Sequence, residues 1–202
     1  AAGPEESATL RVRRWRLPVA LAAGACALTA VVGVAWWLAP SSLPAGPPAF
    51  TRLTDQPGPE LYANLSPDGA SLAYAARSSG NWDIYLQRVG GKTAINLTKD
   101  SRADDTQPAF SPDGQRIAFR SERDGGGIFV MGATGESVKR LTDFGYNPAW
   151  SPDGKEVVCA TAGFVRPDIR WYLLSQLFAV NVATGAKRLL TPTGQDALQP
   201  HW

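Results

Sequence analysis

The hydrophobic positions of the chain fall into two patterns. Between Leu17 and Ala39 there is no charged residue, and apolar side chains follow one another almost without interruption. From Phe50 onward, short apolar runs alternate with polar turns that contain glycine and proline. The first pattern predicts one long apolar helix, and the second predicts a series of short β-strands.

The uncharged stretch is long enough to cross a membrane. Its 23 residues would span about 34 Å as a helix, against a bilayer core of about 30 Å. Trp15, Trp36 and Trp37 lie near its two ends, where aromatic rings favour the membrane interface. We expect a transmembrane helix at residues 17–39 and not a cleaved signal peptide, whose apolar core is only about 7–15 residues long.

The charges around this helix predict its orientation. Four arginines precede it within six residues, whereas Arg52 is the first charge after it. The positive-inside bias therefore predicts a cytoplasmic tail at residues 1–16 and a C-terminal region in the periplasm or outside the cell, in a single-pass protein of a bacterial inner membrane. Residues 40–50 contain four prolines, which favour a semi-rigid spacer.

Two markers recur along the rest of the chain with one period. Ser-Pro-Asp-Gly occurs at 66–69, 111–114 and 151–154, and Leu-Thr occurs at 53–54, 97–98, 141–142 and 190–191. Between the markers, each unit has the same order of predicted elements. These are strands at 72–74, 117–119 and 157–159, strands at 84–86, 128–130 and 177–179, and Gly-containing turns at 90–91, 134–135 and 184–185.

The chemistry of the first marker explains its recurrence. Proline presets φ for the second position of a tight turn, Asp tolerates the third, and Gly adopts the left-handed conformation that restores strand pairing. An apolar residue precedes each turn, at Leu65, Phe110 and Trp150. Four-stranded units of this length cannot bury both faces alone, so they must stack on one another. The sequence predicts an all-β fold, a partial β-propeller of about three blades at residues 51–202.

These markers resemble the TolB-like repeats, often described as WD40-like, from about residue 50 to residue 202. The resemblance rests on the three Ser-Pro-Asp-Gly turns, the Leu-Thr markers, and the segments Gln107-Pro108-Ala109-Phe110 and Asn147-Pro148-Ala149-Trp150. The third unit departs from the pattern by an insertion around residues 162–175. Because residues 199–202 repeat the segment before the turn, and residue 1 is not Met, we expect both ends to lie inside a longer protein.

Similar bacterial proteins carry a cytoplasmic serine/threonine kinase domain before one transmembrane helix and such a propeller. The resemblance therefore implies an extracytoplasmic sensing or interaction module, which would bind a protein, peptide or glycan at the propeller face. Three alternatives remain open: a membrane-bound winged-helix transcription regulator, a TolB-like envelope scaffold, and a propeller-bearing peptidase whose Gly-x-Ser-x-Gly motif would lie beyond residue 202.

Charge and cysteine usage narrow the functional classes. The chain has 20 basic and 18 acidic residues, and from residue 50 onward the two kinds balance. A neutral region lacks the basic surface that phosphate backbones require, which argues against nucleic-acid binding. Cys26 lies in the apolar stretch and Cys159 in a predicted strand, so no disulfide is expected, and a buried, unreactive thiol is expected for Cys159.

No motif in these residues predicts catalysis, a cofactor or a metal. Asp143-Phe144-Gly145 spells a kinase triplet without its partner motifs, and Gly69–Ala73 matches the nucleophile elbow only in part and on a hairpin. Gly125–Gly127 is interpreted as a hairpin connection, and Asp100, Asp104 and Asp105 as a solvated loop. The remaining candidates are the single histidine, His201, and a glycosylation sequon that coincides with a marker at Asn96-Leu97-Thr98.

Overall fold

The computed structural model describes residues 50–77, 80–163, 175–192, 197 and 199–200. The chain divides into two compact units at residue 50, and the fold below is that of the second. The predicted cytoplasmic tail, the predicted transmembrane helix and almost all of the Pro-rich spacer lie outside the described residues. Within the ranges given above, no helix is long and apolar enough to span a bilayer.

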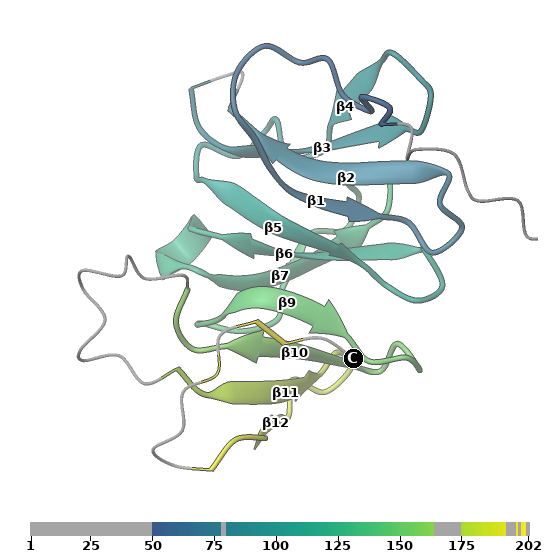
Figure 1. Ribbon diagram of the computed structural model, residues 1–202. Coiled ribbons are helices and arrows are strands. Elements are labelled where there is room, and N and C mark those ends of the chain that lie inside the picture. The colour runs from purple at the N-terminus through teal and green to yellow at the C-terminus, as the bar shows by residue number, and fades with distance from the viewer. Residues whose placement is uncertain (1–49, 78–79, 164–174, 193–196, 198, 201–202) are drawn as a thin grey trace, which may run out of the picture. The chain divides into compact units, whose positions relative to one another are not determined.

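The described residues of the second unit form three four-stranded antiparallel sheets, which we call blades 1 to 3 (Figure 1). In each blade the strands follow one another as a meander. Blade 1 contains β1 (Glu60–Leu65), β2 (Ser71–Ala76), β3 (Asp83–Arg88) and β4 (Ala94–Asn96). Blade 2 contains β5 (Asp105–Phe110), β6 (Arg116–Ser121), β7 (Gly127–Gly132) and β8 (Lys139–Arg140), with a short 3-10 helix, η1 (Arg123–Gly125), between β6 and β7. Blade 3 contains β9 (Tyr146–Trp150), β10 (Glu156–Ala160), β11 (Leu177–Asn181) and β12 (Lys187–Leu189).

This arrangement confirms the all-β fold and the four-stranded repeat expected from the sequence. Each Ser-Pro-Asp-Gly segment joins the first two strands of its blade, and its glycine has φ between +67° and +69°. The serine hydroxyl organises the turn, since in blade 2 Ser111 Oγ lies 2.5 Å from Asp113 Oδ1 and 2.9 Å from the backbone nitrogen of Arg116. The insertion in the third unit falls between β10 and β11, and residues 164–174 of it lie outside the described ranges.

The turn glycine of blade 2 provides a simple stability test. Replacing Gly114 by alanine is expected to cost about 1–2 kcal/mol of unfolding free energy, because an L-residue is strained at φ +69°. Steric clash adds little, since the nearest atom to an added Cβ is 3.6 Å away. Gly114→Asn should cost less, because asparagine tolerates the left-handed region. Urea unfolding of both variants checks this, and equal losses would contradict the backbone explanation.

Two hydrophobic clusters hold the blades together. The cluster between blades 1 and 2 combines Ile84 of blade 1 with Ile117 and Phe119 of blade 2, all fully buried. The cluster between blades 2 and 3 combines Ile128 with Val157 and further side chains of blade 3. Burying a side chain of this size contributes about 1.5–3 kcal/mol. Each blade is therefore stabilised mainly by its neighbour, as expected for stacked repeats.

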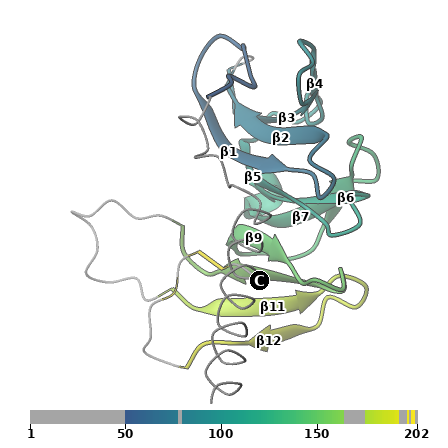
Figure 2. The same cartoon turned by 45° about the vertical axis from the view of Figure 1, so that its right-hand side comes forward.

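The first strands of the three blades lie side by side. In every sheet the first strand is an edge strand, and β5 contacts both β1 and β9. The rotated view in Figure 2 shows the same succession of β1, β5 and β9 from blade to blade. The edge strands β1, β5 and β9 thus form one wall.

Candidate functional site

A groove runs along the wall formed by β1, β5 and β9. Its volume is about 420 Å³, and it is lined by equivalent positions of the three strands together with Gln199 and Pro200. Its side chains are amides, aromatic rings, prolines and alanines, and none of the described lining residues is charged. We refer to it as the inner groove. It is the surface on which all three repeats converge.

Each strand of the wall carries a β-bulge at the same place. Tyr62, Gln107 and Asn147 each lie four positions before the turn serine, and their φ values are +57°, +56° and +51°. The strand register shifts at this point in all three blades. A residue other than glycine in this region costs of order 1–3 kcal/mol, and such strain occurs often at functional sites. The bulge re-aims three side chains in the wall of the groove.

The bulge residues also connect neighbouring blades. Gln107 Oε1 accepts a hydrogen bond of 2.7 Å from the backbone N–H of Asn147, which links β5 to β9. Between β1 and β5 the link comes from a different position, since Asn64 Oδ1 accepts a 2.9 Å bond from the backbone N–H of Phe110. The bulge residue of blade 1 is Tyr62, whose exposed fraction is 48%. It therefore places a large amphipathic ring on the wall of the groove.

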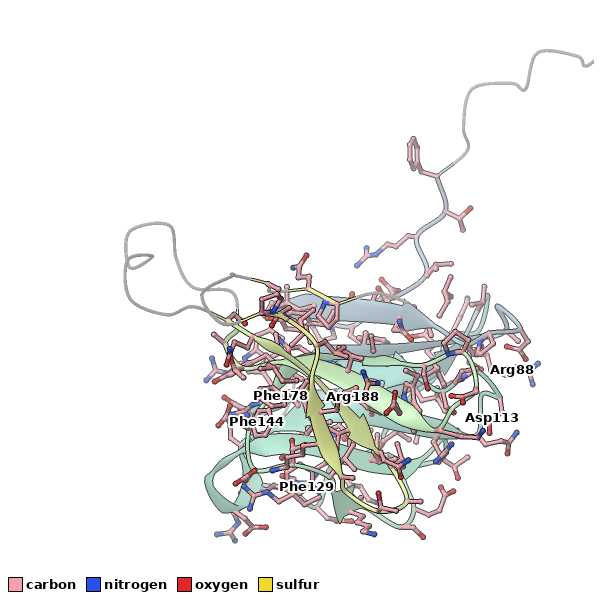
Figure 3. All side chains as sticks on the ribbon, turned by 90° about the horizontal axis from the view of Figure 1, so that it is seen from below. Arg88, Asp113, Phe129, Phe144, Phe178 and Arg188 are labelled. Atoms are coloured by element: carbon pink, nitrogen blue, oxygen red, sulfur yellow. The ribbon has the colours of Figure 1, made fainter. Side chains whose placement is uncertain are left out.

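The proline turns of neighbouring blades lie side by side, and Pro112 of the second turn lines the groove. An added Cβ at Gly114 would lie 3.6 Å from Pro67, and one at Gly154 would lie 3.8 Å from Pro112, so successive turns are adjacent. Figure 3 shows Asp113, which belongs to the second turn, on the opposite side of the blades from Phe144 and Phe178. The pKa of the turn aspartate is lowered in all three turns, at Asp68, Asp113 and Asp153. The hydrogen bond from the turn serine is the largest cause, and a hydrogen bond from a backbone N–H is the second.

A second cavity, of about 430 Å³, lies between blades 1 and 2 and is lined largely by polar side chains. Its acidic neighbours have structural roles. Asp104 Oδ1 accepts a 2.9 Å bond from the N–H of Trp82, and Arg123 Nη2 lies 2.7 Å from Oδ2 of the fully buried Asp105. Burial raises the pKa of Asp105. The interpretation of this segment as a solvated loop is thus wrong for Asp105, because its carboxylate ties β5 to η1.

Asp100, near these two aspartates, lines the same cavity. The three residues do not assemble a cation site. Across the described part of the chain, no three His, Cys, Asp or Glu side chains are grouped so that they could hold a metal ion. The inner groove is the better candidate for ligand binding, because equivalent positions of all three repeats line it.

The kinase-like triplet is a structural element between blades 2 and 3. Asp143 Oδ1 accepts a 2.7 Å bond from Lys187 Nζ, and the ring of Phe144 packs edge-on against Phe178 with centroids 5.3 Å apart. Gly145 has φ +117°, and an added Cβ would lie within 3 Å of two side chains of the core between these blades. The packing explains why these residue types occur there, which confirms the loop interpretation.

Three further candidates from the sequence have structural roles in the blades. Gly125 ends η1 and Gly127 begins β7, so the three glycines lie at the end of the β6–β7 hairpin connection, and a Cβ at Gly126 would lie 2.5 Å from Arg120 Nη2. Ser71 begins β2 directly after a turn, so the elbow-like segment is a hairpin, as expected. Asn96 Nδ2 donates a 2.8 Å bond to a carboxylate of β3, so the sequon amide is engaged within the blade.

The expected burial of Cys159 is confirmed. Its exposed fraction is 0%, and burial raises the pKa of its thiol to about 12. A thiol that remains protonated at neutral pH is a poor nucleophile. Cys26 and His201 lie outside the described residues.

Comparisons with known proteins agree on the fold. A family described as the TolB beta propeller domain matches residues 49–202. Among solved structures, TolB from Acinetobacter baumannii is similar at 30% identity and a TM-score of 0.54, over 68% of this chain and 33% of that one. A putative TolB from Agrobacterium tumefaciens is similar at 27% identity and a TM-score of 0.56, over 66% of this chain and 50% of that one.

Curated relatives include enzymes. Dipeptidyl-peptidase 5 of Porphyromonas gingivalis is 37% identical over 110 residues, which are 46% of this chain and 16% of the peptidase. An uncharacterized peptidase of Bacillus subtilis is 33% identical over 107 residues, again 46% of this chain and 16% of the relative. This chain thus spans only a small part of the length of these relatives.

Proposed function

Because the chain belongs to the TolB beta propeller domain family, we propose that it is a protein-interaction module whose inner groove binds an extended, uncharged peptide segment of a partner protein. The observation that carries the proposal is the lining of the groove. It combines amides with aromatic rings and prolines, and its described residues carry no charge. Amides can bond a peptide backbone, and aromatic side chains are enriched among the few residues that contribute most to binding at protein interfaces.

The position of the groove supports the same proposal. It lies along edge strands, so backbone groups on that side have no strand partner within the described sheets. An extended peptide can bond such groups and place alternate side chains against the wall. The bulges and the bonds between β5 and β9 hold the wall rigid, and rigid surfaces lose little entropy on binding.

Tyr62 provides the test. The probe peptides are selected for binding from a phage-displayed dodecapeptide library. Replacing Tyr62 by alanine should weaken their binding by about tenfold or more, because a half-exposed aromatic ring is removed from the groove. The backbone should be unaffected, since alanine keeps the Cβ. Ile95→Ala is the matched control: Ile95 is 59% exposed on β4, outside the groove. Isothermal titration calorimetry should show a lower peptide affinity for Tyr62→Ala and an unchanged affinity for Ile95→Ala.

Equal losses for the two variants, or selected peptides that bind elsewhere, would contradict the assignment of the groove. Selective binding of oligosaccharides in place of peptides would also overturn it, because the groove would then be a glycan site.

We further propose that the module is the extracytoplasmic sensing part of a membrane-anchored bacterial signalling protein, with a serine/threonine kinase as its output domain. The uncharged stretch at residues 17–39 and the arginines before it support this placement. Alkaline phosphatase fused after residue 50 should be active, because this placement exports the fusion point from the cytoplasm. An inactive fusion, with an active cytoplasmic reporter at the same point, would contradict the placement.

A peptidase accessory propeller is the second candidate function, favoured by the 37% identity to dipeptidyl-peptidase 5. In that case the groove would admit peptides to a hydrolase domain elsewhere in the protein. Labelling the product of the complete reading frame with a fluorophosphonate probe separates the two functions. A labelled serine supports the peptidase, whereas ATP-dependent autophosphorylation supports the kinase.

A further inference from the structure

A pocket of about 300 Å³ lies at the junction of blades 2 and 3, and we call it the junction pocket. None of its described lining residues also lines the inner groove. Its apolar lining includes Val130 and Leu141 of blade 2 and Val182, which follows β11. All three are half-buried against the cluster between these blades. A volume of this size is at the lower end of the range for small-molecule sites.

Two basic residues line this pocket from one face of blade 2. Arg116 is paired with Gly132 across β6 and β7, and Lys139 is paired with Val130 across β7 and β8. Paired residues point to the same face of a sheet, and so do residues two apart on one strand. Arg116 and Lys139 therefore share the face of Val130, which packs toward blade 3.

The repeat shows how close these two positions are. In blade 3 the same positions, two after the turn glycine and two before the marker leucine, hold Glu156 and Arg188. Arg188 Nη2 lies 3.0 Å from Glu156 Oε2 (Arg188 is labelled in Figure 3), so head groups at these positions come within ion-pair distance. In blade 1 the two positions hold Ser71 and Ile95, which are uncharged. Among the three described blades, only blade 2 has two cations there.

The guanidinium of Arg116 is held in place without an acidic partner. Its Nη2 donates a 3.0 Å bond to the carbonyl of Gly154, and its central carbon lies 4.5 Å from the centroid of the Trp150 ring. Within the described residues, neither Arg116 nor Lys139 makes a salt bridge. A fixed guanidinium with unused N–H groups loses little conformational freedom when it binds a carboxylate.

The other charged residues of the junction pocket are engaged elsewhere. Thr134 Oγ1 donates a 2.6 Å bond to Glu136 Oε2, and the second carboxylate oxygen of Glu136 lies over Gly132, where an added Cβ would collide with it. Arg140 directs its guanidinium to two backbone carbonyls. The pocket therefore has two cations without a described acidic partner beside an apolar lining.

We propose that the junction pocket binds a small organic acid, whose carboxylate lies between Arg116 and Lys139 and whose apolar body contacts the three half-buried apolar residues. The carboxylate takes the place that Glu156 has in blade 3, where an anion faces the cation at the second position. A guanidinium binds a carboxylate through parallel N–H groups, and the ammonium adds a second charge. The bound anion also relieves the repulsion between two neighbouring cations.

The test uses the protein expressed from its complete reading frame, with 3-phenylpropanoate and octanoate as probes. Isothermal titration calorimetry should detect binding of at least one of these acids. The primary amide of that acid, and acetate, should bind at least about tenfold more weakly, because the amide lacks the charge-assisted hydrogen bonds and acetate lacks the apolar body. No binding of either acid, or equal binding of an acid and its amide, overturns the proposal.

A charge reversal locates the site. Lys139→Glu places a carboxylate beside Arg116, which reproduces the ion pair of Glu156 and Arg188. The variant should lose at least about tenfold in affinity for the acid. Its melting temperature should equal or exceed that of the wild type, since an ion pair replaces a repulsion. Lys92→Glu is the matched control, because Lys92 is an exposed lysine between β3 and β4, and its affinity for the acid should be unchanged.

Lys139→Gln repeats the measurement without a new charge. It should also weaken acid binding, but by less than Lys139→Glu does, because Arg116 remains free to bind the carboxylate. Unchanged affinity in both Lys139 variants, or equal losses for Lys139→Glu and Lys92→Glu, overturns the proposal. A melting temperature of Lys139→Glu below that of the wild type also overturns it, because positions 116 and 139 would then not face one another.

Discussion

Replacing Trp150 by alanine is expected to lower the free energy of unfolding by about 3–5 kcal/mol, the usual cost of removing a large buried aromatic side chain. Trp150 is 6% exposed, and its Nε1 donates a 3.0 Å hydrogen bond to the carbonyl of Ala109 in the preceding blade. The guanidinium of Arg116 lies 4.5 Å from the centroid of its ring. The variant therefore loses packing, a buried hydrogen bond and a cation–π contact at one junction.

Trp150→Phe separates these contributions. Phenylalanine keeps most of the ring volume and leaves only the carbonyl of Ala109 without its donor, so this variant should lose about 1–3 kcal/mol. Urea denaturation with fluorescence detection measures both, and alanine should cost clearly more than phenylalanine. Losses of less than about 1 kcal/mol for Trp150→Ala would show that blades 2 and 3 do not depend on this junction.

Replacing Arg123 by alanine should destabilise the protein by about 3–5 kcal/mol at pH 7, because it leaves a buried carboxylate without its partner. The side chain of Asp105 is fully buried, and Arg123 is the cation that pairs with it. Arg123 also donates to Ser101 Oγ at 2.9 Å, which fixes the segment before β5. The double variant Arg123→Ala/Asp105→Ala should recover part of the loss, since the uncompensated charge is gone.

The pH dependence has a definite sign. Burial raises the pKa of Asp105 above its ordinary value, so the folded state binds this proton more tightly than the unfolded chain. The contribution of Asp105 to stability therefore improves as the pH falls through its folded pKa toward 3.8. Removing Arg123 raises this pKa further. The destabilisation should consequently be largest near neutral pH and shrink on acidification; a pH-independent loss would contradict the buried-charge explanation.

The blade architecture could be predicted because its signals are local. A Ser-Pro-Asp-Gly turn determines its own backbone, and its glycine has the positive φ that the turn chemistry requires. Apolar runs beside such turns are sufficient to predict hairpins. The loop at Asp143-Phe144-Gly145 could also be predicted from the sequence, because the triplet follows a Leu-Thr marker and lacks the partner motifs of a kinase.

The site depended on contacts that the sequence does not show. Nothing adjacent to Gln107 indicates that its amide bonds the backbone of Asn147, forty residues later. The β-bulge is equally hidden, because Tyr62, Gln107 and Asn147 are three different residue types at one position. The prediction for Asp105 is wrong for a related reason. Its acidic, polar segment is typical of a solvated loop, but the Asp105 side chain is buried and pairs with Arg123, which lies on the far side of a hairpin.

An experimental structure of the region from residue 51 onward, within the complete protein, tests the blade arrangement directly. We expect β5 and β9 to lie side by side in one wall, with Gln107 Oε1 within hydrogen-bond distance of the Asn147 nitrogen. We also expect the first strands of the three blades to face one common groove. A structure in which the three turns point in unrelated directions, or in which β1, β5 and β9 are separated by other strands, would contradict it.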